Sequence, residues 1–311
     1  MPLAEFDLIR RFFAGKPCAN PSTQLGVGDD CALLSVPSSS QLAITADTMV
    51  ENVHFLPDVE PEALGHKLLA VNLSDLASMG AQPVAVTLAL TMPKAEVSWL
   101  QCFARGFFAL AERYQVDLIG GDTTAGPLTL TVQAMGLVPA GKALLRSTAQ
   151  PGDLVYMSGK LGDAGLGLKI EQGYRCNDSE EALIRFNRPE PRIKEGLALR
   201  GIASSCIDIS DGLAQDLGHI LRQSGVGACL DWERLPMSDA VRAYINDTGD
   251  WSFPLRAGDD YELCFTVPPD KAELLQGNFA RIGVIEGHPG LRMVRSGTTQ
   301  KISVQGFEHF S

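Results

Sequence analysis

Short apolar runs bounded by turn residues alternate along the chain with segments whose apolar residues recur at helical spacing. The first half of the chain predicts strands at 41–50, 83–93, 116–126 and 128–138, and helices at 61–79 and 95–114. In the second half, a strand-to-helix joint at 205–225 is followed by a further unit around 255–268. This alternation predicts a mixed α/β (α+β) fold.

A Pro-Gly turn and a run of glycines within 149–167 indicate a domain boundary near residue 148. We therefore expect two domains, 1–148 and 149–311, and 311 residues are enough for each to bury its own core. The longest apolar runs, such as 84–90, are less than half the length that crosses a bilayer. The first residues resemble no secretion signal, so we expect no membrane partner and a cytoplasmic location.

Charge and cysteine content narrow the possible partners. The net charge of −11 argues against nonspecific nucleic-acid binding, which depends on basic patches. Seven cysteines without a CxxC spacing fit reduced, mostly buried thiols in the cytosol, and the scattered histidines do not indicate zinc. If this acidic protein binds an anion, a bound divalent cation is the simplest source of the positive charge that the anion requires.

Aspartates recur where predicted strands end beside glycine and hydroxyl residues. Asp30 follows the run Gly-Val-Gly, Asp47 and Asp122 each lie near the end of a strand, and Asp208 and Asp211 flank Ser210. Open α/β sheets build binding sites at such strand ends. Each of these aspartates alone could equally be an ordinary turn residue, but the set of them favours a site.

Asp75 strengthens this interpretation because helical spacing places it on the same face as Leu68 and Val71, where the core is expected. A buried carboxylate beside others must take up a proton or bind a cation. Oxygen ligands from aspartate and threonine suit Mg²⁺, so we expect the dispersed aspartates to converge on magnesium.

The joint at 206–217 begins a helix, and Ser210 or Asp211 could cap it, although a cap does not account for Asp208. Free N–H groups at a helix start also suit phosphate oxygens. Arg146, just before a turn, could clamp phosphate or be an ordinary solvated arginine. His54 lies close to Asp47 in sequence and could equally be a partly buried imidazole. No P-loop and no kinase-type catalytic loop occur.

Together, these stretches resemble the thiamine-monophosphate kinases over nearly the whole chain. The resemblance is carried, in order, by GVGDDCA, TADTMVENVHF, NLSDLASMGAQP, GGDTT, RSTAQPGD, SGKLGDAGLGL, DISDGLAQDL, AGDDYELCFTVP and GFEHF. It implies a two-domain fold, a homodimer whose N-terminal strands form a barrel across the interface, and transfer of the ATP γ-phosphoryl group to thiamine monophosphate. The acceptor is then a phosphate that is already ionised, so no acid or base residue is required.

The resemblance also implies roles for individual residues. The implied ligands of several Mg²⁺ ions are Asp30, Thr45, Ala46, Asp47, Asp75, Asp122, Asp208 and Asp211. The implied ATP contacts are Gly121, Asp122, Arg146 and Ser210, and the implied thiamine-side contacts are His54, Asp259 and Phe307.

Four positions depart from the pattern of the family. Ala46 replaces a frequent hydroxyl residue and could contact a metal only through its carbonyl, and Asn52 replaces a common glycine. The usual Gly-Gly-Glu-Asp is Ala-Gly-Asp-Asp at 257–260, so the carboxylate of Asp259 has a shorter reach. Alternatives are another ATP-using enzyme of the same superfamily or a non-catalytic metal- or nucleotide-binding module. The reactive cysteine of selenophosphate synthetases is absent from the N-terminal segment.

Overall fold

The computed structural model describes residues 5–14, 16–176 and 179–304, which form two compact units. The first unit holds the chain up to Leu76 together with Ala81–Gly141, and the second holds Ala77–Gly80 and the chain from Lys142 onward. The alternation of strands and helices confirms the predicted mixed α/β class. Within the described ranges, no helix combines the length and the apolar character that crossing a membrane requires.

The first unit is built on a four-stranded sheet in the order β3-β6-β4-β5. Its strands are β3 (Ser40–Val50), β4 (Gln82–Met92), β5 (Asp117–Ala125) and β6 (Thr129–Pro139). Among the described strand pairs of this sheet, β4 and β5 are parallel and the other two pairs are antiparallel, as expected because β4 and β5 are joined through a helix. Smaller elements precede the sheet: α1 (Glu5–Phe12), β1 (Thr23–Leu25) and β2 (Leu33–Leu34).

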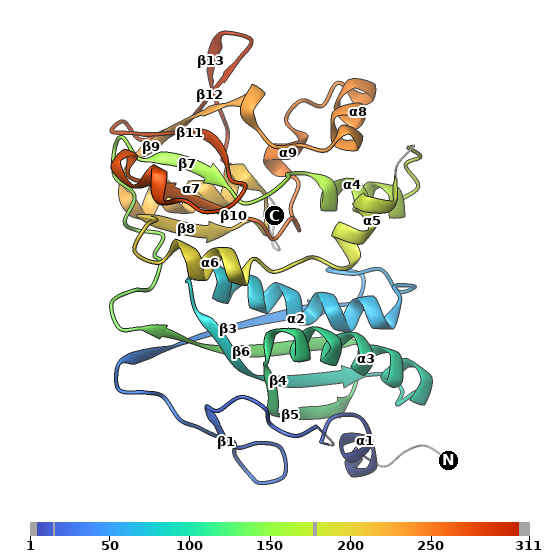
Figure 1. Ribbon diagram of the computed structural model, residues 1–311. Helices are drawn as coiled ribbons and strands as arrows, with labels where there is room; N and C mark the ends of the chain where they lie inside the picture. Colours follow the sequence, from blue (N-terminus) through green and yellow to red (C-terminus); the bar gives the residue numbers. More distant parts are fainter. Residues whose placement is uncertain (1–4, 15, 177–178, 305–311) are drawn as a thin grey trace. The chain divides into compact units, whose positions relative to one another are not determined.

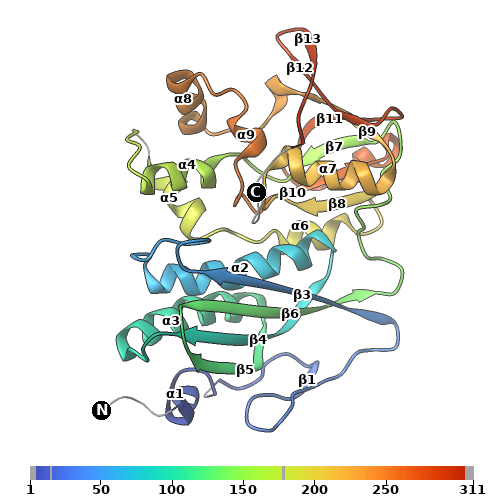
Figure 2. The same ribbon diagram turned by 180° about the vertical axis from the view of Figure 1, so that it is seen from behind.

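Two long helices, α2 (Pro61–Ser78) and α3 (Val97–Tyr114), cover the same face of this sheet (Figures 1 and 2). Glycines let the two helices approach closely. An added Cβ at Gly106 would lie 1.8 Å from the carbonyl oxygen of Glu62, and one at Gly65 would lie 2.2 Å from that of Phe103. This contact holds α2, with its inward-facing polar residues, against the sheet.

Strand β5, which the sequence predicts at 116–126, contains a pair of adjacent glycines. The strand continues through Gly120 and Gly121 because its parallel ladder with β4 extends to Ala125. Gly121 has φ +149°, and an added Cβ would lie 1.9 Å from the carbonyl oxygen of Leu88. The glycine therefore serves close strand packing.

The second unit contains a seven-stranded sheet in the order β13-β12-β9-β11-β7-β10-β8. Its strands are β7 (Leu154–Met157), β8 (Ser205–Asp208), β9 (Gly227–Asp231), β10 (Leu263–Val267), β11 (Ala280–Glu286), β12 (Gly290–Arg295) and β13 (Thr298–Lys301). Its α-helices are α4 (Asp163–Glu171), α5 (Ser179–Asn187), α6 (Ile193–Leu199), α7 (Leu213–Ser224), α8 (Asp239–Thr248) and α9 (Phe253–Arg256). Two short 3₁₀ helices, Trp232–Arg234 and Pro269–Leu274, complete it.

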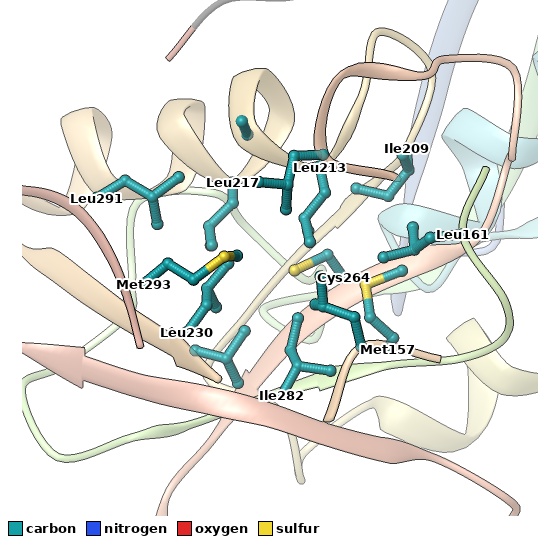
Figure 3. Close-up of a cluster of buried hydrophobic side chains, with 14 of the residues drawn as sticks. Met157, Leu161, Ile209, Leu213, Leu217, Leu230, Cys264, Ile282, Leu291 and Met293 are labelled. Carbon is teal, nitrogen blue, oxygen red and sulfur yellow. The ribbon is translucent and has the colours of Figure 1, made fainter. Parts of the chain in front are cut away.

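The core of this unit lies between α7 and the sheet (Figure 3). Leu213 and Leu217 of α7 are fully buried and point toward strand residues that include Met157, Cys264 and Ile282. This packing fixes the start of α7 beside the end of β8, where the sequence predicts a site. All seven cysteines are free thiols, and two of them, Cys206 and Cys264, are buried.

Candidate functional site

In the first unit, two acidic side chains and a threonine meet between β3 and α2. Thr45 and Asp47 are two residues apart on β3, so their side chains share the sheet face that α2 covers. The hydroxyl of Thr45 donates a hydrogen bond to Oδ2 of Asp75 on α2. Asn72, one turn earlier on α2, accepts the backbone N–H of Asp47 at 3.1 Å and donates to the carbonyl of Leu68 at 3.0 Å. The helix thus holds the strand end in place.

Asp47 and Asp75 lie close enough for their negative charges to repel each other, so the pair favours binding of a proton or a cation. Burial, and then the neighbouring Asp75, raise the pKa of Asp47 to about 6. The side-chain atoms of Thr45, Asp47 and Asp75 that could bind a metal ion are all oxygens, the ligands that Mg²⁺ prefers. Within the described ranges, no cluster of three or more histidine, cysteine or acidic side chains is arranged to hold a metal ion. The protein therefore presents a pair of carboxylates with a hydroxyl.

Asp122 lies on the other face of the same sheet. It pairs in register with Ala89 of β4, whereas Asp47 pairs with Val132, which in turn pairs with Leu88. Because Ala89 and Leu88 are consecutive, their side chains point to opposite faces. Asp122 is exposed, and its Oδ1 accepts the N–H of the next residue at 2.8 Å. Within this unit, the sheet does not bring Asp122 to the Asp47 and Asp75 pair, so its ligand role stays a prediction.

Three other residues of the first unit stay predictions of the sequence. Asp30 is exposed after β1, and its N–H donates to Oδ1 of Asp29 at 2.8 Å. Ala46 and Gly121 are exposed positions on β3 and β5.

His54 lies in the turn that follows β3. Its Nδ1 accepts the backbone N–H of Val50 at 3.0 Å, so the neutral ring carries its proton on Nε2. Asn52 in the same turn has φ +64°, the left-handed conformation that glycine or asparagine adopts most easily. The substitution of the common glycine by asparagine thus keeps the turn, and with it the placement of His54 next to the Asp47 strand.

In the second unit, the acidic stretch after β8 forms a tight turn into α7. Asp208 ends β8 and is only 4% exposed, while Ser210 and Asp211 are half-buried. The predicted cap at Ser210 or Asp211 is wrong, because the helix begins after Gly212 with no side-chain cap. Asp216, in the first turn of α7, instead accepts the N–H groups of residues 210, 211 and 212 at 3.1, 3.0 and 3.1 Å.

Asp216 was not assigned a role from the sequence, although its spacing from Asp211 was visible. Burial and the neighbouring Asp211 raise its pKa to about 7, against the three N–H groups that favour the ionised form. Asp211 itself accepts a hydrogen bond from Gln215 at 3.0 Å. Asp216 therefore shapes the turn that presents Ser210 and Asp211.

Arg146 is fixed beside the end of α7 by its backbone. Its carbonyl accepts the hydroxyl of Ser224, the last residue of α7, at 3.0 Å. Burial, and then the guanidinium groups of Arg222 and Arg146, lower the pKa of His219 on the same helix. Nδ1 of His219 lies 3.0 Å from the guanidinium of Arg222. The second half of α7 thus has cationic side chains near it, which suits an anionic ligand.

Asp259 lies in a loop anchored by two acidic residues that the sequence did not single out. Asp260 is buried and accepts the N–H of Gly162 at 2.8 Å. Glu262 is fully buried and forms ion pairs with Arg185, at 2.5 Å, and with Arg192. The hydroxyl of Ser158 also donates to Glu262, at 2.5 Å. Phe307, predicted as a thiamine contact, lies outside the described residues.

Two domain models account for most of the chain. The model described as AIR synthase related protein, N-terminal domain, matches residues 28–138, and that for the C-terminal domain matches residues 150–295. The fold and its acidic strand ends are therefore those of the AIR-synthase-related class.

Full-length relatives narrow the class. The thiamine-monophosphate kinase of Salmonella typhimurium is 46% identical over 100% of this chain and 99% of its own length. The crystal structure of thiamine-monophosphate kinase from Stenotrophomonas maltophilia K279a has a TM-score of 0.85 at 45% identity, covering 94% of this chain and 97% of that one. A structure of AaThiL complexed with AMPPCP and TMP has a TM-score of 0.80 at 30% identity, covering 100% and 99%. The chain belongs to the thiamine-monophosphate kinase family.

Proposed function

We propose that this protein transfers the γ-phosphoryl group of ATP to thiamine monophosphate, giving thiamine diphosphate and ADP. The observation that carries the proposal is full-length identity of 44–46% to thiamine-monophosphate kinases, with the whole of the chain matched. The relative solved with AMPPCP and TMP supports the same pair of ligands.

Magnesium fits the side chains that the first unit presents. Asp47 and Asp75 are close enough for one to raise the pKa of the other, and Thr45 adds a hydroxyl oxygen. When bound, Mg²⁺ would neutralise phosphate charge and orient the reacting groups. We assign it to these three residues together with Asp30, Ala46, Asp122, Asp208 and Asp211.

The two substrates are assigned to different sets of residues. We assign ATP to Gly121, Asp122, Arg146 and Ser210. The cationic side chains near His219, in the second half of α7, support the assignment of Arg146. We assign the thiamine side of the acceptor to His54, Asp259 and Phe307. The Nε2–H donor of His54 and the anchored carboxylate of Asp259 support the first two.

The reaction needs no residue that accepts a proton, because the attacking oxygen belongs to a phosphate that is ionised at neutral pH. The protein then contributes position and electrostatic complementarity. Arg146 would stabilise phosphate charge, and the turn shaped by Asp216 would hold Ser210 and Asp211 at fixed positions. Transfer in line with the leaving ADP follows from this general chemistry.

We also propose that the protein is a homodimer with a barrel of N-terminal strands across its interface. The sheet face opposite α2 and α3 supports this assembly, because Ile44 on it is 58% exposed. Asp122 lies on the same face, so the interface would come close to an assigned ligand of ATP. Seven free thiols support a cytoplasmic location.

The test is ADP release by the purified protein with and without thiamine monophosphate, at several Mg²⁺ concentrations. We expect ADP formation that depends on both the acceptor and the metal. Equal release with aminoimidazole precursors would favour another enzyme of the superfamily. Metal-dependent ATP binding without ADP formation for any acceptor would favour a non-catalytic module.

A further inference from the structure

The loop that carries Asp259 has a strained backbone. Asp259 has φ +65° and Tyr261 has φ +48°, and neither is glycine. Such conformations cost free energy and persist only where the surroundings fix them. The contacts around the loop must therefore hold it in a conformation that its own residues do not favour.

Backbone hydrogen bonds attach one edge of the loop to the turn that follows β8. The N–H of Asp259 donates to the carbonyl of Ser210, and that of Tyr261 donates to the carbonyl of Ile209, both at 2.8 Å. Gly258 permits this approach, since an added Cβ would lie 2.3 Å from the carbonyl oxygen of Ser210. The loop is thus joined to the residues that present Ser210 and Asp211.

The side chains of the loop alternate between interior and surface. Asp260 is 2% exposed and accepts the N–H groups of Gly162 and Ala164, at 2.8 and 3.3 Å. Glu262 is fully buried in its ion pairs. Asp259 and Tyr261, between and beside these anchors, are half-exposed and hydrogen-bonded to each other: Oη of Tyr261 donates to Oδ1 of Asp259 at 3.0 Å.

We propose that Tyr261 is a positioning residue that fixes the carboxylate of Asp259 for the acceptor substrate. The inference rests on the proposed role of Asp259 on the thiamine side. Aspartate is one methylene shorter than the glutamate usual at this position, so its carboxylate reaches less far and can adjust less to the position of the ligand. A hydroxyl donor two residues away removes rotamer freedom from the carboxylate before the substrate arrives.

The hydrogen bond also selects the kind of group that Asp259 can bind. A carboxylate that is held in one direction suits a cationic ring or an amino group, and the thiamine moiety offers both. ATP offers an amino group but no cationic ring, so loss of the tyrosine hydroxyl is expected to affect the acceptor more than the nucleotide.

The experiment measures KM for both substrates and kcat in Tyr261→Phe and Asp259→Asn, alone and combined. We expect Tyr261→Phe to raise KM for thiamine monophosphate about fivefold, the size of one lost hydrogen bond, and to change KM for ATP less than twofold. The matched control is Tyr174→Phe, which removes a tyrosine-to-aspartate hydrogen bond of equal length, 3.0 Å to Asp247, outside the loop. The control should leave both KM values unchanged.

The combined variant separates positioning from a structural role. If Tyr261 acts through Asp259, adding Tyr261→Phe to Asp259→Asn raises KM no further. Multiplying effects, or an equal rise for ATP, would overturn the inference. A normal KM for Tyr261→Phe beside a raised one for Asp259→Asn would overturn it while leaving the role of Asp259 intact. A normal KM for Asp259→Asn would remove that role, and the inference with it.

Discussion

Buried acidic groups occur in both units, but they are neutralised in different ways. In the second unit, Glu262 is fully buried and satisfied by Arg185, Arg192 and the hydroxyl of Ser158. In the first unit, Asp47 is half-buried beside another half-buried acid, Asp75, and its pKa rises to about 6. The first arrangement is complete within the protein. The second requires a proton or a cation, and this is the difference that we expect between a structural acid and the metal-binding acids that we propose.

The largest expected effect concerns the incomplete pair. Asp75→Asn keeps the size of the side chain but removes a charge that magnesium would require, so ADP formation should fall by about a thousandfold or more. The thermal unfolding temperature in EDTA should stay near wild type or rise, because the repulsion on Asp47 is relieved. Activity near that of wild type would show that the pair does not bind the metal.

A change in the Glu262 cluster, which is satisfied within the protein, should instead lower the stability of the fold. Glu262→Gln leaves two guanidinium groups without their buried carboxylate, and unfolding free energy should fall by about 3 kcal/mol or more. Urea unfolding measures it. The control is Arg10→Ala, which breaks a pair whose side chains are 74% and 55% exposed and should cost well under about 1 kcal/mol. A loss for Glu262→Gln as small as for Arg10→Ala would contradict the comparison.

The raised pKa of Asp47 also predicts a pH dependence of stability. A carboxyl whose pKa is raised in the folded state stabilises the fold most below its unfolded pKa near 4, and loses that contribution as pH rises through about 6. In EDTA, stability should therefore fall by at most about 3 kcal/mol between pH 4 and 7 on account of Asp47. Asp47→Asn should flatten that part of the profile. Denaturant unfolding at several pH values measures it, and an unchanged slope would argue against the raised pKa.

The comparison also shows what could be read from the sequence. Helical spacing placed Asp75 toward the core, because that periodicity is local. Thr45 was identified only through the family resemblance, and the structure places it on the same face of β3 as Asp47. The face on which Asp122 lies depends on the register across β6 and β4, which no local pattern specifies. The loop around Asp259 depends on partners about 50 to 100 residues away, among them Ser210 and Gly162. Such partners leave no local signal.

The cap of α7 illustrates the same limit on a smaller scale. A short polar residue before an apolar helical run predicts a cap at Ser210 or Asp211. The helix begins after Gly212 without a side-chain cap. Asp216 instead reaches back from the first turn to the N–H groups of the three residues that precede the helix. The sequence pattern marked where the helix begins but did not show that Asp216 would hold the turn before it.

The smallest expected effect tests the junction between the loop and the turn. In Gly258→Ala the new methyl group would meet the carbonyl of Ser210 at 2.3 Å, so the loop must shift and stability should fall by about 2 kcal/mol. Gly287→Ala is the matched control, since the nearest atom to its added Cβ is 4.0 Å away. Because Asp259 moves with the loop, KM for thiamine monophosphate should rise in Gly258→Ala and stay constant in Gly287→Ala. Equal behaviour of the two variants in thermal unfolding and KM would show that the loop is not held against the turn as the hydrogen bonds indicate.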